Sequence, residues 1–403
     1  MARETRERLK SLDAFRGLTI AGMLLVNDPG TWIAIYTPLE HAEWPGWTPT
    51  DLVFPFFLFI VGITTRLSLE GRRARGAAES DITRQIIKRG AIIFLLGFLF
   101  NGFPYFTWTD IPGVHDPSFM LRVGDRLLHW RIMGVLQRIG VAYIIAAHIA
   151  QRTTLKQQVL TIVGLLFVYW VAMTMLPVPD TGVIGQLALG SPEHTMAAWW
   201  DRTLLDWSRF NLGNHNWSGS VRWDPEGIFS TIPAVATVML GILAGRWIGS
   251  DRPLDERLNG LFAVGALGIM AGLMWNWSCP INKNIWTSSY VVFTAGMAAV
   301  SLATIMWVVD VKRYDWWTQP FVIYGMNPIL AYVGSQFMAR VIYSILTVQY
   351  HGKMVPLQTA IYESAFASWL EPKNASLAFA LAVVFLWYGI VYALYRKNIF
   401  LKV

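Results

Sequence analysis

The residues with the clearest chemistry are Asn27, near the end of the first long apolar stretch, and His41 and Asp51 in the polar segment that follows it. A histidine beside a carboxylate is the simplest general base near neutral pH. A buried amide such as that of Asn27 can donate a hydrogen bond to a developing oxyanion. We therefore predict that these three residues are catalytic. Two simpler interpretations stay open, namely His41 as an ordinary loop histidine and Asp51 as the N-cap of the helix that follows it.

Two arginines lie inside otherwise apolar stretches, Arg16 near the N-terminus and Arg138 directly after Gln137. Burying a charge is costly unless the charge is paired. Asp13 is three residues from Arg16, so the two can form an ion pair on one helix face. A guanidinium also binds phosphate with two parallel hydrogen bonds. Each arginine therefore suits either a structural ion pair or an anionic ligand that carries phosphate.

Three further polar blocks interrupt the apolar pattern. They are Trp223-Asp224-Pro225-Glu226-Gly227, Asn282-Lys283-Asn284 and Tyr324-Gly325-Met326-Asn327-Pro328. Acidic residues in a first helical turn suit the helix dipole, which is the structural interpretation of Asp224 and Glu226. Lys283 is expected to pair with one of these carboxylates. A proline inside an apolar stretch frees backbone groups that can line a cavity.

The composition of the whole chain indicates an integral membrane protein. Of its 403 residues, 54% are hydrophobic and 15% are charged, whereas a soluble domain carries about 25% charged residues. A single cysteine excludes a disulfide scaffold, and the 20 tryptophans are typical of the aromatic belts at membrane interfaces. We expect no metal, because the Cys and His residues lack the spacing of metal ligands. We expect no nucleic-acid partner, because the aromatic residues belong to the membrane belts.

The apolar pattern predicts an all-α protein with about ten transmembrane helices in a single domain, residues 1–403. The predicted spans are 13–35, 52–69, 86–106, 132–150, 157–177, 228–248, 258–277, 286–309, 317–339 and 375–395. Lys and Arg concentrate at the N-terminus, the C-terminus and every second loop, so both termini are predicted to be cytoplasmic. The long loops 107–131, 177–227 and 340–374 then lie on the outer side.

Several blocks of the sequence resemble the lysosomal heparan-alpha-glucosaminide N-acetyltransferase family and its bacterial homologues. The similar segments are 11–17, Val26-Asn27, His41 with 51–55 and Gly62, 136–138, 224–227, 282–284 with Trp286 and Ser288, and 325–327. The resemblance implies a multi-pass acetyltransferase that takes acetyl from cytoplasmic acetyl-CoA and passes it to an amino sugar on the far side. It implies that His41 is the active-site histidine and Asn27 its partner.

These observations together give a residue-level hypothesis. Donor contacts are assigned to Arg16, Gln137, Arg138, Ser288 and Asn327, and acceptor contacts to Trp44, Trp217, Asp224, Glu226, Lys283 and Asn284. The partners are acetyl-CoA, a glucosamine-type acceptor and the lipid bilayer, with a homodimer as a candidate assembly. We expect the protein in a bacterial inner (plasma) membrane.

Two other functions fit parts of the pattern. A secondary transporter for sugars or amino sugars fits ten spans and a polar interior. The sequence lacks the two similar halves that many carriers show, and its polar residues gather toward one face and not at the midplane. A non-catalytic membrane partner needs only the apolar surface and gives no reason for the buried polar blocks.

Overall fold

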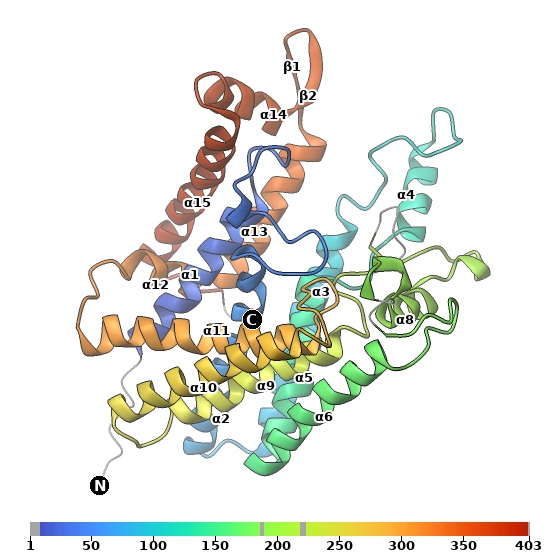
Figure 1. Cartoon of the computed structure of the whole chain (residues 1–403). Coiled ribbons are helices and arrows are strands. Elements are labelled where there is room, and N and C mark those ends of the chain that lie inside the picture. The colour runs from blue at the N-terminus through green and yellow to red at the C-terminus, as the bar shows by residue number, and fades with distance from the viewer. Residues whose placement is uncertain (1–8, 186–188, 218–222, 402–403) are drawn as a thin grey trace.

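The structure, a computed structural model, describes residues 9–185, 189–217 and 223–401 and is predominantly helical (Figure 1). Its longer helices are α1 (Lys10–Asn27), α2 (Thr50–Ala74), α3 (Glu79–Gly102), α5 (Val135–Arg152), α6 (Leu155–Thr174), α9 (Thr231–Ile248), α10 (Leu254–Trp275), α11 (Ser288–Met306), α13 (Pro328–Arg340) and α15 (Pro372–Arg396). The shorter elements are α4 (Phe119–Leu128), α8 (Met196–Leu205), α12 (Gln319–Met326), α14 (Leu357–Tyr362) and an antiparallel hairpin of β1 (Thr347–Tyr350) and β2 (Lys353–Pro356).

Six of the described helices are long and apolar enough to cross a membrane. They are α2, α6, α9, α10, α11 with its continuation to Val311, and α15. The other four predicted spans also coincide with helices, namely α1, α3, α5 and the pair α12–α13. The chain is therefore an all-α protein of the membrane-spanning kind, and the count of ten spans stays a prediction. The first helix ends at Asn27, before the predicted boundary, because the sequence Asp28-Pro29-Gly30 follows it.

Close approach of helix backbones builds the centre of the bundle. A Cβ atom on Gly62 of α2 would lie 2.1 Å from the carbonyl oxygen of Val238 in α9, and a Cβ atom on Gly241 would lie 2.0 Å from the carbonyl oxygen of Phe59. Small residues at such crossings let membrane helices pack by van der Waals contact, which replaces the hydrophobic effect inside a bilayer. The α2–α9 crossing therefore depends on glycine on both sides.

The ninth predicted span is broken into α12 and α13 at Asn327-Pro328. The Asn327 side chain donates from Nδ2 to the Ile399 carbonyl and accepts from the Leu401 amide, so it ties the break to the C-terminal segment. Proline at position 328 starts α13, where a backbone N–H would have no acceptor within the helix. The break brings Gly325, Met326 and Pro328 to the wall of a cavity described below.

The segments predicted as outer loops contain short elements. In Figure 1, α4 and α8 lie together on the right and the β1–β2 hairpin lies at the top, away from the helices at the bottom of the bundle. The α1–α2 loop carries His41, and the loop before α11 carries Lys283. The loops thus supply polar groups to the ends of α1, α2, α3, α5 and α13, where the candidate site lies.

Candidate active site

The loop between α1 and α2 is held by one carboxylate, and this carboxylate also binds the predicted catalytic histidine. Asp51 is 1% exposed, and its Oδ1 lies 2.7 Å from Nδ1 of His41. Its Oδ2 accepts from the backbone N–H groups of Ala42 and Thr48, both at 3.0 Å. Pro49 and not Asp51 occupies the N-cap position of α2. The carboxylate therefore fixes Nδ1 as the protonated ring nitrogen and leaves Nε2 as the one able to accept a proton.

Lys283 completes this cluster from a distant part of the sequence. Its Nζ lies 3.0 Å from Nδ1 and 3.2 Å from Nε2 of His41, and 3.6 Å from Oδ1 of Asp51. The Gly46 amide donates to the Ile281 carbonyl at 2.7 Å, which joins the two loops. Burial lowers the pKa of the Lys283 ammonium, and the Asp51 carboxylate opposes this shift. Lys283 thus contacts His41 and Asp51 instead of forming the expected ion pair with Asp224 or Glu226.

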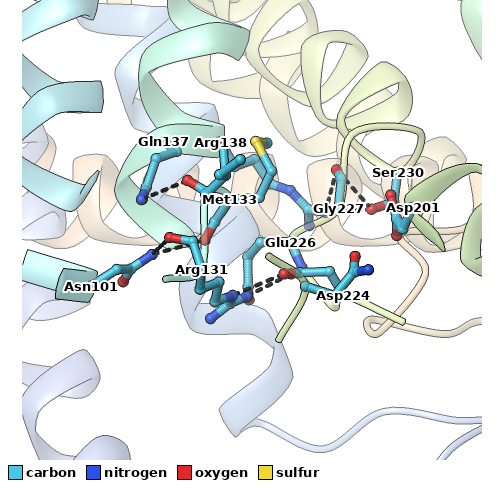
Figure 2. A network of polar contacts seen from close by, with 12 residues as sticks. Asn101, Arg131, Met133, Gln137, Arg138, Asp201, Asp224, Glu226, Gly227 and Ser230 are labelled. Carbon is cyan, nitrogen blue, oxygen red and sulfur yellow. Dashed lines mark hydrogen bonds and ion pairs between the residues drawn. The ribbon is translucent and has the colours of Figure 1, made fainter. Parts of the chain in front are cut away.

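Arg131 is the cation that pairs with those two acidic residues (Figure 2). Its Nε and Nη2 donate to the two carboxylate oxygens of Asp224 at 2.9 and 2.5 Å, and Nη2 also reaches Glu226 Oε2 at 2.5 Å. Burial by itself would raise the pKa of Glu226, but the charges of Arg131, Arg138 and Lys283 together with the hydrogen bond from Arg131 hold it below its usual value. The two bonds to Asp224 and the one to Glu226 fix both carboxylates in direction.

Arg138 lies beside this network but is completely buried. Its Nη2 donates to the Ser230 hydroxyl, and the guanidinium lies 5.0 Å from the centre of the Trp286 ring. Asp201 holds the same turn from the other side by accepting from the Ile228 amide at 2.9 Å, and burial followed by the charge of Asp224 raises the pKa of Asp201 to about 8. The Nε and Nη1 atoms of Arg138 are buried without a hydrogen-bond partner within the described residues, and the phosphate-binding role of Arg138 stays a prediction.

A cavity of about 310 Å³ lies next to this cluster and is called the His41 cavity. The ends of α1, α2, α3, α5 and α13 form its walls. The predicted site residues that line it are Asn27, His41, Gln137, Glu226 and Lys283, and the residues not predicted include Asn101, Arg131, Tyr332, Gln336 and Arg340. The structure thus brings Asn27 and His41 to one cavity, as the catalytic hypothesis requires.

A second cavity of about 530 Å³, the arginine cavity, lies between the opposite ends of the same helices. Three guanidinium groups line it, those of Arg16, Arg72 and Arg89. Arg16 forms an ion pair with Asp13 at 3.0 Å, as the sequence predicts. The Nε atom of Arg89 is buried without a hydrogen-bond partner. Within the described residues neither Arg72 nor Arg89 forms an ion pair, so this cavity carries uncompensated positive charge.

A narrow cavity of about 80 Å³, the apolar passage, lies between the other two. It shares Met23, Val135, Leu136 and Tyr332 with the His41 cavity and Arg16, Arg89, Tyr143, Pro328 and Ile329 with the arginine cavity. The rest of its wall is mostly apolar, with Ile20, Phe57, Ile60 and Ile93. The shared wall residues therefore place the three cavities in a row, from a cluster of arginines to the histidine site.

The remaining predicted residues line neither the His41 cavity nor the arginine cavity. Ser288 donates to the Leu166 carbonyl at 2.7 Å, and Asn327 ties down the C-terminal segment. Trp44 donates to the Leu189 carbonyl at 2.6 Å, Trp217 packs edge-on against Trp223, and the Asn284 amide donates to the side chain of Asn282. Their geometry is that of structural residues, and their ligand-binding roles stay predictions.

The residues that the sequence reasoning missed fall in two groups. Arg72 and Arg89 belong to the positive loop charges from which the membrane orientation is predicted, although both line the arginine cavity. Tyr332, Gln336 and Arg340 recur at every fourth position near the end of a predicted span. That spacing places polar groups on one helix face and is a signal that could have been found.

The fold and the site define a class, a polytopic helical membrane protein with a His–Asp–Lys cluster at one end of a row of three cavities. The family model described as "Heparan-alpha-glucosaminide N-acetyltransferase, catalytic" matches residues 8–272, and the chain belongs to this family. It is 29% identical to heparan-alpha-glucosaminide N-acetyltransferase of Mus musculus over the whole chain and 61% of that relative. Against the enzyme of Homo sapiens, identity is 30% over 98% of this chain and 60% of the relative. The chain thus spans about 60% of the length of these relatives.

Proposed function

We propose that the protein is a transmembrane N-acetyltransferase that moves acetyl from cytoplasmic acetyl-CoA to the amino group of a glucosamine-type sugar on the outer face. The observation that carries this proposal is the row of three cavities with shared wall residues, from the arginine cavity through the apolar passage to the His41 cavity. The family membership supports the same chemistry. The protein would act as a multi-pass protein of a bacterial plasma membrane, with a homodimer as its candidate assembly.

The donor would bind with its phosphates among Arg16, Arg72 and Arg89. Guanidinium groups suit phosphate because they donate two parallel hydrogen bonds, and the unpartnered Nε of Arg89 leaves a donor for such a ligand. The neutral pantetheine arm would occupy the apolar passage. Arg16 and Asn27 lie eleven residues apart on α1, which corresponds to about 16 Å along the helix. An extended arm over that length would place the thioester carbonyl beside Asn27 and His41.

His41 Nε2 would remove a proton from the attacking amine, because Asp51 holds the ring proton on Nδ1. The amine nitrogen forms a bond to the thioester carbon, the carbon–sulfur bond breaks, and the departing thiolate takes up a proton. Asn27 would donate a hydrogen bond to the oxyanion of the tetrahedral intermediate. A two-step route, with acetyl first on His41 and then on the amine, uses the same residues.

Lys283 would act on His41 and Asp51. Its ammonium lies within 3.2 Å of Nε2, so in the empty site it competes with substrate for that nitrogen. When an amine binds to Nε2, Lys283 retains Asp51 as its partner and can also donate to the intermediate. Glu226 lines the same cavity and would attract the cationic form of the acceptor. The cationic amine must release one proton to solvent before it attacks, and His41 accepts the second proton as the carbon–nitrogen bond forms and passes it to the departing thiolate.

The proposal is tested by acetyl transfer with the purified protein in liposomes. Labelled acetyl-CoA is supplied on one side and glucosamine on the other, and N-acetylglucosamine is measured. We expect transfer by the wild type and by the control variant His129→Ala, since His129 directly follows α4 and lines neither the His41 cavity nor the arginine cavity. His41→Ala should lose at least about a hundredfold in rate. Uptake of labelled glucosamine without acetyl-CoA, and without acetylation, would instead make the protein a transporter.

A further inference from the structure

Lys283, His41 and Asp51 have the arrangement of a nucleophile, its base and the group that orients the base. Nζ of Lys283 lies 3.2 Å from Nε2 of His41, and Oδ1 of Asp51 lies 2.7 Å from the other ring nitrogen, Nδ1. Enzymes activate a nucleophile of their own by placing it within hydrogen-bond reach of an oriented base in this way. The Lys283 amine therefore already occupies the position beside Nε2 that the proposed function gives to the amine of the acceptor.

Lys283 also shares its cavity with the groups that would act on the thioester. Its side chain lines the His41 cavity together with His41 and Asn27. The backbone carbonyl of Lys283 accepts from the Trp286 amide at 3.1 Å, which fixes the turn that carries the side chain. An acetyl group delivered to His41 would therefore lie beside the Lys283 amine whether or not an acceptor is bound.

The surroundings of Lys283 favour the neutral amine, which is the form that attacks a carbonyl. Burial lowers the pKa of the Lys283 ammonium and the charge of Arg138 acts in the same direction, while Asp51 and Glu226 oppose the shift without cancelling it. An ion pair with Asp51, at 3.6 Å, explains only part of the position of Nζ. It gives no reason for the shorter contacts of Nζ with both ring nitrogens of His41, at 3.0 and 3.2 Å.

We propose that, when no acceptor is bound, the protein transfers acetyl from acetyl-CoA to Nζ of its own Lys283 and thereby inactivates itself. The inference rests on the proposed function and adds a modification site to it. The Lys283 ammonium first releases one proton to solvent. Nζ then forms a bond to the thioester carbon, the carbon–sulfur bond breaks, and His41 takes the second proton and passes it to the thiolate. The products are Nζ-acetyl-lysine and free coenzyme A.

Acetylation of Lys283 would stop transfer for two reasons. The product is an amide, so Nζ loses its charge and Asp51 loses its ion-pair partner. The added acetyl group also fills the space beside Nε2 of His41 where an acceptor amine has to lie. An amide, unlike a thioester, does not pass its acetyl group on to another amine, so the modified chain is an end product. A bound acceptor would protect Lys283 because its amine displaces Nζ from Nε2.

The test is mass spectrometry of the purified protein after incubation with isotopically labelled acetyl-CoA, without acceptor. We expect acetyl on Lys283, less of it when glucosamine is present, and a rate of labelling at least about a hundredfold lower in His41→Ala, since His41 supplies the general base. Lys353 is exposed on β2 and outside the His41 cavity, so it reports uncatalysed acetylation and should react equally in both proteins. Absence of acetyl on Lys283, or equal labelling of Lys283 in both proteins, overturns the inference.

A second measurement tests the effect on activity. The protein is incubated with acetyl-CoA for increasing times before glucosamine is added, and the fraction of activity lost should equal the fraction of chains acetylated on Lys283. Lys283→Arg cannot be acetylated and should keep its own starting rate at all times, whereas the control Lys353→Arg should decline like the wild type. Acetylated Lys283 in a fully active wild type refutes self-inactivation, and this comparison holds even if Lys283→Arg itself is inactive.

The two measurements separate this inference from the proposed function. Transfer to glucosamine without acetyl on Lys283 refutes self-acetylation and leaves the acetyltransferase intact. Acetyl on Lys283 that depends on His41, without transfer to glucosamine, refutes glucosamine as acceptor and supports self-acetylation. Unlabelled acetyl already present on Lys283 of the purified protein counts as modification. Absence of both reactions refutes both proposals.

Discussion

Replacing Asp51 by asparagine changes the charge at the centre of the site and keeps the shape of the side chain. One carboxylate oxygen lies 2.7 Å from His41 Nδ1, and the other accepts from the amides of Ala42 and Thr48. Because those amides can only donate, the asparagine oxygen must face them and its NH₂ group must face His41. The NH₂ group donates, so Nδ1 must become the acceptor and the ring proton must move to Nε2.

A protonated Nε2 cannot accept a proton from the amine, so the variant loses the general base without losing the histidine. A wrong histidine tautomer of this kind lowers kcat by about 10⁴-fold in the serine-protease triad. We expect a decrease of about 10³–10⁴-fold in kcat for Asp51→Asn at neutral pH, which corresponds to about 4–5.5 kcal/mol of transition-state stabilisation. The route through acetyl-histidine predicts the same loss, because Nε2 is its nucleophile.

The assay is steady-state acetyl transfer to the best acceptor, together with calorimetric binding of acetyl-CoA. Donor binding should stay within about twofold of the wild type, because the phosphates would bind in the arginine cavity and not near Asp51. Asp125→Asn is the control, since Asp125 also lies beside a histidine, with its carboxylate 3.4 Å from His129 Nδ1, but does not line the His41 cavity. If Asp51→Asn keeps more than a tenth of kcat, the tautomer argument is wrong.

Three further predictions follow from other parts of the molecule. Arg72→Gln and Arg89→Gln should each weaken acetyl-CoA binding about tenfold in calorimetry without changing the KM of the acceptor, because each removes an uncompensated charge from the arginine cavity. Asp201 has its pKa raised from 3.8 to about 8 by burial, so the folded protein retains this proton while the unfolded chain releases it, and stability should fall between pH 4 and 8. Asp201→Asn should flatten that fall, measured as the melting temperature at pH 5 and pH 8; an unchanged slope contradicts the assignment. Gly62→Ala should lower the melting temperature by several degrees, because its methyl group would overlap the Val238 carbonyl of α9; Gly164→Ala, where the added carbon meets nothing, is its control.

The local features of the site were predictable from the sequence, and the long-range pairings were not. Each of the ten predicted spans coincides with a helix, because apolar stretches of about 20 residues carry that information locally. The His41–Asp51 contact is also local, since its partners lie ten positions apart. The ion pair of Arg131 with Asp224 joins residues 93 positions apart. Several cations were available to Asp224, and only the packing of α5 against α9 decides among them.

The partner of Lys283 is a second long-range contact that the sequence does not predict. The sequence indicated that an outer lysine would pair with an acidic residue, and it does, but with Asp51 and not with Asp224 or Glu226. The choice depends on how the loop before α11 joins the α1–α2 loop at Gly46, through a backbone hydrogen bond that no side-chain pattern records. The Arg16–Asp13 pair needed no such information because its partners are three residues apart on one helix.

The two cavities differ in how their cations are compensated, and this difference would separate the two substrates of the proposed reaction. Arg72 and Arg89 have no ion-pair partner in the described residues, which suits a donor with several phosphate charges. In the His41 cavity Arg131 and Lys283 have carboxylate partners, which suits an acceptor without phosphate charges. Between them, the part of the apolar passage lined by Ile20, Phe57, Ile60 and Ile93 offers phosphate no charged partner, and transfer of an unpaired charge into such surroundings costs several kcal/mol. The neutral arm and its acetyl group could therefore reach His41 while the nucleotide stays at the arginines, so the acetyl group would cross and coenzyme A would not.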